Sequence, residues 1–191
     1  MTPRESLERA VATPGQQLPL NGNKSSAVLL AVVDRPTGAT LVMLKKSSAM
    51  RRHAGQIGFP GGGVEANESS ENAALREAWE EIGLPPESVQ MLGALDDDRT
   101  YVTNYHIRPL LAWVSEPPPS WRADPVEVER VLELPLAEVV AAEPVSWLDF
   151  SMFGIAFRAP RFHFADGTVV WGASARILLR FIERVRPHWD P

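Results

Sequence analysis

The stretch that decides the fold runs from Gly62 to Leu84 and reads GGVEANESSENAALREAWEEIGL. Its later part, from Ser69 to Ile82, predicts a helix, because Ser69 can cap the amino end and the alanines and leucine that follow are good helix formers. Gly83, followed by two prolines, is a stop signal. A helix with a well-marked beginning and end therefore follows directly on a glycine-rich turn.

Three glutamates gather on one face of this helix. At about 100° per residue, Glu77, Glu80 and Glu81 fall within roughly 100° of arc, opposite an apolar stripe. Most charge runs are solvated faces, but here only Glu80 has a basic neighbour at helical spacing, Arg76. The last turn of a helix also disfavours negative charge, by about 0.3–1 kcal/mol for each residue. A divalent cation removes both penalties, and oxygen ligands suit Mg²⁺ or Mn²⁺, so the pattern predicts a metal site.

The whole stretch resembles the Nudix box, the signature of hydrolases that act on nucleoside diphosphates linked to another moiety. The match has one soft departure, Ala78, where the family prefers isoleucine, leucine or valine. The resemblance implies an α/β fold, an α/β/α sandwich around a mixed β-sheet. It also implies a metal-dependent pyrophosphohydrolase in which Glu77, Glu80 and Glu81 are both the metal ligands and the catalytic residues.

Other positions of the box are expected to shape the site. Arg76 is expected to orient the loop by holding Glu68 or Glu80 through a charge-assisted bond. Gly61 and Gly62 are expected to form a turn that needs φ > 0 and lies close to the metals, where backbone N–H groups can also receive a phosphate.

A second motif lies just upstream of this stretch and narrows the range of expected substrates. It comprises Leu44 to Ser47, the basic pair Arg51 and Arg52, and the run Phe59 to Gly62. Together these resemble the additional signature of coenzyme A pyrophosphatases within the Nudix family. The departures are Leu44, where the family usually has threonine, and Lys46, where it usually has arginine and a bidentate phosphate contact. We expect Lys46, Arg51 and Arg52 to bind a phosphate of coenzyme A, the alternative for the two arginines being a solvated loop face.

The implied reaction is hydrolysis of coenzyme A to 3′,5′-ADP and 4′-phosphopantetheine by water activated on one to three metal ions. Two alternatives stay open. The substrate can be another diphosphate or nucleotide, such as ADP-ribose, NADH or a nucleoside triphosphate, or the chain can be a catalytically silent binding module. Such modules tend to lose box glutamates, which this chain keeps. The general base is left open between the box glutamates and a later acid such as Glu116.

Composition sets broader expectations. The 191 residues, 45% of them hydrophobic, are enough for one domain spanning 1–191. The absence of cysteine excludes disulfides and thiol catalysis. The sequence shows no signal region and no long apolar run, so we expect a cytoplasmic protein without a membrane partner. A net charge of −5 argues against nucleic acid and means that a phosphate ligand needs local cations. The oligomeric state is not indicated, and a homodimer is possible.

Periodicity and turn signals place the remaining elements. We expect helices over about 3–12, 136–142 and 173–185, and strands over 26–34, 40–44, 57–59, 89–95, 106–114 and 126–134. Pro109 suggests an edge or bulge position within its strand. A hairpin is expected at Asp166-Gly167, and residues 96–98 are expected to begin a turn. We interpret four tryptophans as core or interface residues: Trp79, Trp113, Trp147 and Trp171.

Overall fold

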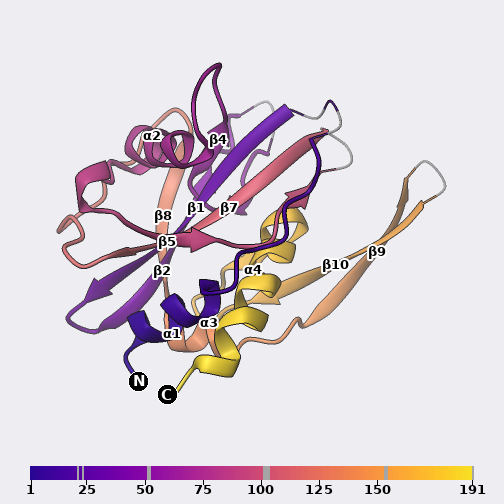
Figure 1. Ribbon diagram of the computed structural model, residues 1–191. Coiled ribbons are helices and arrows are strands. Elements are labelled where there is room, and N and C mark those ends of the chain that lie inside the picture. The colour runs from indigo at the N-terminus through magenta and orange to yellow at the C-terminus, as the bar shows by residue number, and fades with distance from the viewer. Residues whose placement is uncertain (21, 23, 51–52, 101–103, 153–154, 191) are drawn as a thin grey trace.

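A mixed β-sheet forms the centre of the protein in the computed structural model, which describes residues 1–20, 22, 24–50, 53–100, 104–152 and 155–190 (Figure 1). The strand order is β3-β2-β1-β7-β5, and β4, β6 and β8 pair with β1, β7 and β2. β1 (Lys24–Arg35) and β7 (Tyr105–Val114) run parallel, and the other pairs are antiparallel. The centre of β1 is fully buried because both faces of the sheet are covered.

The other strands of this sheet are shorter. β2 (Gly38–Lys46) follows β1 through a tight turn and lies between β1 and β8 (Val128–Pro135). The sheet is completed by β3 (Ile57–Gly58), β4 (Gly61–Gly63), β5 (Gln90–Ala94) and β6 (Asp98–Arg99). Each expected strand is present, with bounds that differ by up to two residues.

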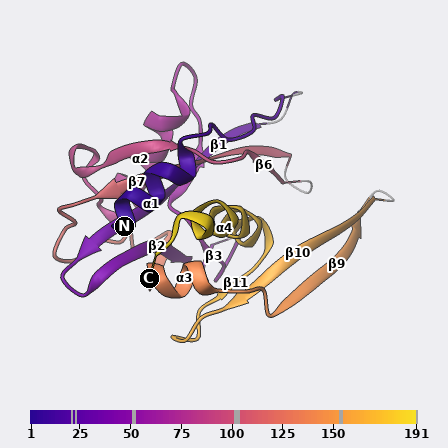
Figure 2. The ribbon, with the colours of Figure 1, turned by 60° about the horizontal axis from the view of Figure 1, so that its bottom comes forward.

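Helices cover both faces of the sheet (Figures 1 and 2). α2 (Ser70–Ile82) packs on one face through a core that contains three of its alanines. α1 (Pro3–Val11), α3 (Leu136–Ala141) and α4 (Gly172–Val185) pack on the other. Short 3-10 turns occupy Pro86–Ser88 and Arg186–His188. The expected α/β sandwich around a mixed sheet is confirmed. None of the helices in the described residues is long and apolar enough to cross a membrane.

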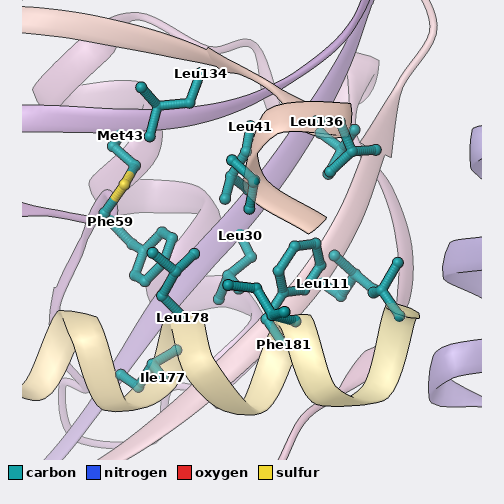
Figure 3. Packing of buried hydrophobic residues seen from close by; sticks show 14 of the residues in the cluster. Leu30, Leu41, Met43, Phe59, Leu111, Leu134, Leu136, Ile177, Leu178 and Phe181 are labelled. Atoms are coloured by element: carbon teal, nitrogen blue, oxygen red, sulfur yellow. The ribbon is translucent and has the colours of Figure 1, made fainter. Parts of the chain in front are cut away.

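The larger core lies under α4 (Figure 3). Ile177, Leu178 and Phe181 point from this helix toward the sheet, where they meet side chains such as Leu30 and Leu111. Leu178, Phe181, Leu30 and Leu111 are all fully buried. Burying a leucine or phenylalanine contributes about 1.5–3 kcal/mol, so this face holds α4 firmly to the sheet.

Pro109 lies in an inner strand of the sheet, so the expected edge position is wrong. A proline is tolerated there because the strands that pair with one side of β7 are interrupted next to it. β7 has β1 on one side and, on the other, β5 and then β6, which pair on either side of Pro109. The Pro109 carbonyl accepts a hydrogen bond from the Leu95 N–H, at 3.0 Å, in the gap between β5 and β6. The missing N–H of the proline points into the same gap, where no regular ladder bond is lost.

A second, three-stranded sheet was not predicted. β9 (Ser146–Met152) and β10 (Ile155–His163) form a long antiparallel hairpin, and β11 (Val169–Val170) pairs with the end of β10 after the expected turn at Asp166-Gly167. Figures 1 and 2 show the hairpin extending away from the main sheet as an arm. Trp147 lies in this arm and is 40% exposed, so of the two expected roles the core role is wrong and the interface role stays a prediction.

Candidate functional site

The ends of α2 are fixed by local hydrogen bonds. The Ser69 hydroxyl accepts a hydrogen bond from the Asn72 N–H at 3.1 Å, and Gly83 adopts the left-handed conformation, with φ of 69°, that ends the helix. Alanines at 73, 74 and 78 face the sheet and are fully buried. Because these side chains are small, the helix backbone lies close to the sheet, and its glutamates can reach the strands beneath.

Glu81 is the buried acid of the site. Only 3% of its surface is exposed, and its carboxylate accepts a hydrogen bond from the Gly61 N–H at 2.9 Å and another from the Lys46 ammonium. Burial raises the pKa of Glu81 above its usual value, while Lys46 and the Gly61 N–H act in the opposite direction. One carboxylate therefore joins α2, β4 and the end of β2, and it brings Lys46 of the second motif into contact with the Nudix-like box.

Gly62 forms a cradle for Glu77. A Cβ at position 62 would lie 2.3 Å from Oε1 of Glu77, so only glycine leaves room for the carboxylate. Gly61 has a φ of 150°, and a Cβ there would lie 2.3 Å from the Ala27 carbonyl oxygen. The expected positive φ is thus found at Gly61, whereas Gly62 is required for space.

Arg76 ties the acids of the box together. Its guanidinium donates to Glu68 at 3.0 and 3.2 Å, to Glu77 at 2.9 Å and to Glu80 at 3.3 Å. It also donates to the Gly63 carbonyl oxygen at 3.0 Å. The carboxylates of Glu68 and Glu77 raise the pKa of Arg76, and the hydrogen bond from Arg76 lowers the pKa of Glu68. Arg76 therefore contacts both of the partners that the sequence offered as alternatives.

The three box glutamates differ in exposure. The side chains of Glu77 and Glu81 are 18% and 3% exposed, and that of Glu80 is 55% exposed. In the part of the chain that the structure describes, no three acidic or histidine side chains lie close enough together to hold a metal ion by themselves. Glu77 and Glu81 face the glycine turn, and Glu80 lies at the rim.

The donors present nevertheless suit a hard divalent ion. A carboxylate offers about four acceptor positions, and Arg76 is hydrogen-bonded to only one oxygen of Glu77. Proximity to Glu77 also contributes to raising the pKa of Glu81, so a cation between the two would relieve repulsion. Glu77 and Glu81 are therefore residues that could hold Mg²⁺ or Mn²⁺.

Glu127 is a neighbour of the site that sequence reasoning missed. Its Oε2 lies 4.0 Å from the ammonium of Lys46, and its backbone carbonyl accepts a hydrogen bond from the Ser47 N–H at 2.8 Å. The side chain is 48% exposed. No local sequence signal marks this residue, because the contact depends on the pairing of β2 with β8. The two expected phosphate ligands Arg51 and Arg52 lie outside the described residues.

A pocket opens beside Lys46 on the α4 face of the sheet. Its volume is about 130 Å³, and its walls are largely apolar, formed by residues such as Phe59, Ile107 and Ile177. Polar groups at its lining include Lys46, His53 and Ser174. The same lysine therefore borders both the buried acid Glu81 and an apolar pocket.

The aspartates at 96–98, expected to begin a turn, instead form ion pairs, and two of them, Asp96 and Asp98, do so with one face of α4. Arg176 contacts Asp98 at 2.8 Å, and Arg184 contacts Asp96 at 2.8 Å. The third aspartate, Asp97, is buried and contacts His106 at 2.8 Å and Arg108 at 2.7 Å. His106 is thus held by a buried carboxylate inside the sheet. Of the other tryptophans, Trp113 is buried, whereas Trp79 and Trp171 are 43% and 44% exposed, so neither is a core residue and an interface role for them stays a prediction.

The amino-acid sequence of this chain is similar to those of a known protein family. The NUDIX domain family matches residues 24–153. NudL of Photorhabdus laumondii, described as an uncharacterized Nudix hydrolase, is 33% identical over 167 residues, which cover 87% of each chain. NudL of Salmonella paratyphi B, with the same description, is 36% identical over 158 residues, covering 81% of this chain and 79% of its own.

Solved structures agree on the fold. A MutT/nudix family protein from Enterococcus faecalis superposes with a TM-score of 0.58 and 16% identity, covering 97% of this chain and 74% of its own. RenU, a Nudix hydrolase from M. smegmatis, gives a TM-score of 0.50 at 20% identity, covering 61% of this chain and 73% of its own. At this level of identity the likeness supports the architecture alone.

Proposed function

Because this chain belongs to the NUDIX domain family, we propose that it is a metal-dependent Nudix pyrophosphohydrolase whose substrate is coenzyme A. The products would be 3′,5′-ADP and 4′-phosphopantetheine. The observation that carries this proposal is the contact of Lys46 with Glu81, because it joins the coenzyme A-type motif to the box acids in one site.

Glu77 and Glu81 would hold Mg²⁺ or Mn²⁺, with Glu80 completing the set. When bound, the ion supplies a water of lowered pKa and neutralises charge on the bridging and leaving oxygens of the diphosphate. Arg76 holds Glu77 in place, and the Gly61 N–H holds Glu81. These fixed partners reduce the reorganisation that the acids need when the diphosphate is bound.

Lys46 would bind the substrate rather than react with it. Its ammonium is already within reach of Glu81 and Glu127, so it is held by two acids at the edge of the site. A phosphate oxygen can share this ammonium, because lysine has three rotatable N–H donors. The apolar pocket beside Lys46 can receive an organic group attached to the diphosphate. Arg51 and Arg52 would supply further positive charge for a phosphate of coenzyme A.

A substrate panel tests the proposal. Coenzyme A, dephospho-coenzyme A, ADP-ribose, NADH and a nucleoside triphosphate would be compared with Mg²⁺, with Mn²⁺ and with a chelator, and the products separated by chromatography. We expect metal-dependent turnover with the highest kcat/KM for coenzyme A. A roughly tenfold preference for another compound, about 1.4 kcal/mol in transition-state binding, would reject coenzyme A while leaving the hydrolase assignment intact. Hydrolysis in ¹⁸O water would identify the phosphorus that is attacked.

A further inference from the structure

The arm formed by β9 and β10 has two unlike faces. Successive residues of a strand alternate between faces, and the register pairs Leu148 with Ala159 and Phe150 with Phe157. One face of the arm thus carries apolar positions from both strands. On the other face, Asp149 forms an ion pair with Arg158 at 3.5 Å, with both side chains exposed. This second face also carries Trp147, whose ring centroid lies 4.9 Å from the guanidinium carbon of Arg158, so it combines charged groups with an exposed aromatic side chain.

β9 is also an unprotected edge strand. It is the last strand in the order β11-β10-β9, and within the described residues no strand pairs with its outer side. Native proteins usually protect such an edge with proline, lysine or a bulge. β9 has no proline and no lysine, and its one charge, Asp149, is already paired with Arg158 in its own hairpin. Its free N–H and C=O groups can therefore accept another strand without opposition from net charge.

Exposed apolar side chains cluster at the base of the same strand. Val145, Trp147 and Leu148 are 58%, 40% and 39% exposed. They are three of the eight large hydrophobic residues that the described part of the chain exposes, and they fall within four consecutive positions. Leu148 lies on one face of the arm and Trp147 on the other, so exposed apolar side chains flank the open strand edge on both faces, which is typical of a protein interface.

We propose that β9 pairs antiparallel with β9 of a second copy of this chain, so that two arms form one continuous four-stranded sheet across a two-fold axis. A two-fold axis brings the same strand edge to itself, which makes an antiparallel pair automatic. A register centred on Asp149 would oppose two carboxylates. A register centred on Phe150 avoids this, because it places Leu148 opposite Met152 and Asp149 opposite Ser151.

Such an interface would be small. A standard interface uses about 20–30 residues and 800 Å² on each side. Edge pairing engages mainly the seven residues of β9 on each side, because β10 lies behind β9, so we expect a weaker dimer than one with a standard interface. An isolated two-stranded hairpin is marginally stable in water, and addition of the partner's strands would also stabilise the arm itself.

The first test measures the oligomeric state of the whole chain by sedimentation velocity over a wide range of concentrations. We expect a dimer for the wild type and, for Leu148→Lys, a dissociation constant raised roughly 30-fold or more. The matched control is Val126→Lys, because Val126 is 74% exposed and lies outside the arm. Circular dichroism should show that both variants are folded. A monomeric wild type, or an equal effect of both substitutions, would overturn the proposal, as would a monomer that binds phospholipid vesicles through Leu148.

The second test uses the absence of cysteine in this chain. Phe150→Cys introduces a single thiol, and directly opposite residues in an antiparallel pair have Cβ atoms about 4.5–5.5 Å apart, near the range of a disulfide. We expect rapid covalent dimer formation under mild oxidation. Ser120→Cys, at an exposed position outside the arm, should not crosslink at the same rate. Equal crosslinking of the two variants would overturn pairing through β9. Since neither test measures hydrolysis, its outcome is independent of the proposed activity.

Discussion

Replacing Gly62 by alanine should displace one box acid while leaving the fold intact. A Cβ at this position would lie 2.3 Å from Oε1 and 2.4 Å from Cδ of Glu77. Ordinary contact begins at 3.4 Å, so the carboxylate must move by about 1 Å. The same Oε1 accepts the 2.9 Å hydrogen bond from Arg76, which would also be lost or lengthened.

The expected loss follows from that displacement. A misplacement of about 1 Å in a reacting constellation can lower the rate roughly 10²-fold, so we expect kcat of Gly62→Ala to fall by about that factor. A shifted side-chain rotamer costs about 0.5–1.5 kcal/mol, so the free energy of unfolding should change little by comparison. Mn²⁺ titration should show weaker binding, because Glu77 is a proposed ligand.

Gly63→Ala is the matched control. It lies next in the same strand, but a Cβ there would meet no heavy atom within 4 Å. We expect its kcat to be close to the wild-type value and its stability to change by less than about 0.5 kcal/mol. Steady-state hydrolysis of coenzyme A and thermal unfolding would be measured for both variants. If Gly62→Ala keeps most of its turnover, or if Gly63→Ala loses as much, the cradle does not position a catalytic acid.

Three further predictions address the acids and the upstream arginines. Glu77→Gln and Glu81→Gln should each fold and lose about 10²-fold or more in turnover. The control is Glu71→Gln, at an exposed glutamate of the first turn of α2, which should keep its turnover. Equal activity of all three variants would contradict the metal assignment. Burial raises the pKa of Glu81 above its usual value of 4.5, so the folded state binds this proton more tightly than the unfolded chain does. The free energy of unfolding of the wild type in metal-free buffer should therefore fall, relative to that of Glu81→Gln, as pH rises above 4.5. Chemical denaturation at several pH values measures this difference, and a pH-independent difference would refute it. Arg51→Ala or Arg52→Ala should raise KM for coenzyme A by roughly 10- to 150-fold, about 1.5–3 kcal/mol, and by less for dephospho-coenzyme A if the contact is to the 3′-phosphate. Unchanged kinetics on both substrates would return these arginines to a solvated surface.

The elements that could be predicted from the sequence are those with local signals. Ser69 and Gly83 mark the ends of α2 through bonds to residues a few positions away, and the helix begins and ends where they indicate. The arm also had a local signal, because apolar and polar residues alternate from Leu148 to Met152. The alternation is interrupted at the start of the strand, where Trp147 and Leu148 are adjacent apolar residues.

The site could be predicted only as a set of residue types. The sequence indicates that Glu77 and Glu81 share a helix face, but it does not show which backbone lies below them. The cradle at Gly62 and the contact with Lys46 arise from long-range packing of α2 on β4 and of β2 on its neighbours. Exposure depends on the same packing, which is why three equivalent glutamates in the sequence become one buried, one half-buried and one exposed side chain.

The arginines of α4 form a pattern that is visible in the sequence, but their ion-pair partners are not. Arg176, Arg180 and Arg184 are spaced by four and therefore share one face of the helix. Their partners at 96–98 lie 78 to 88 positions earlier in the chain, a distance that no local rule bridges. Asp98 is 4% exposed, so removing one of its arginines would leave a poorly compensated buried charge. The apolar face of α4 packs on the sheet, and Arg176 and Arg180 form ion pairs with Asp98 of β6. Together these contacts fix the position of α4, which forms one wall of the pocket beside Lys46.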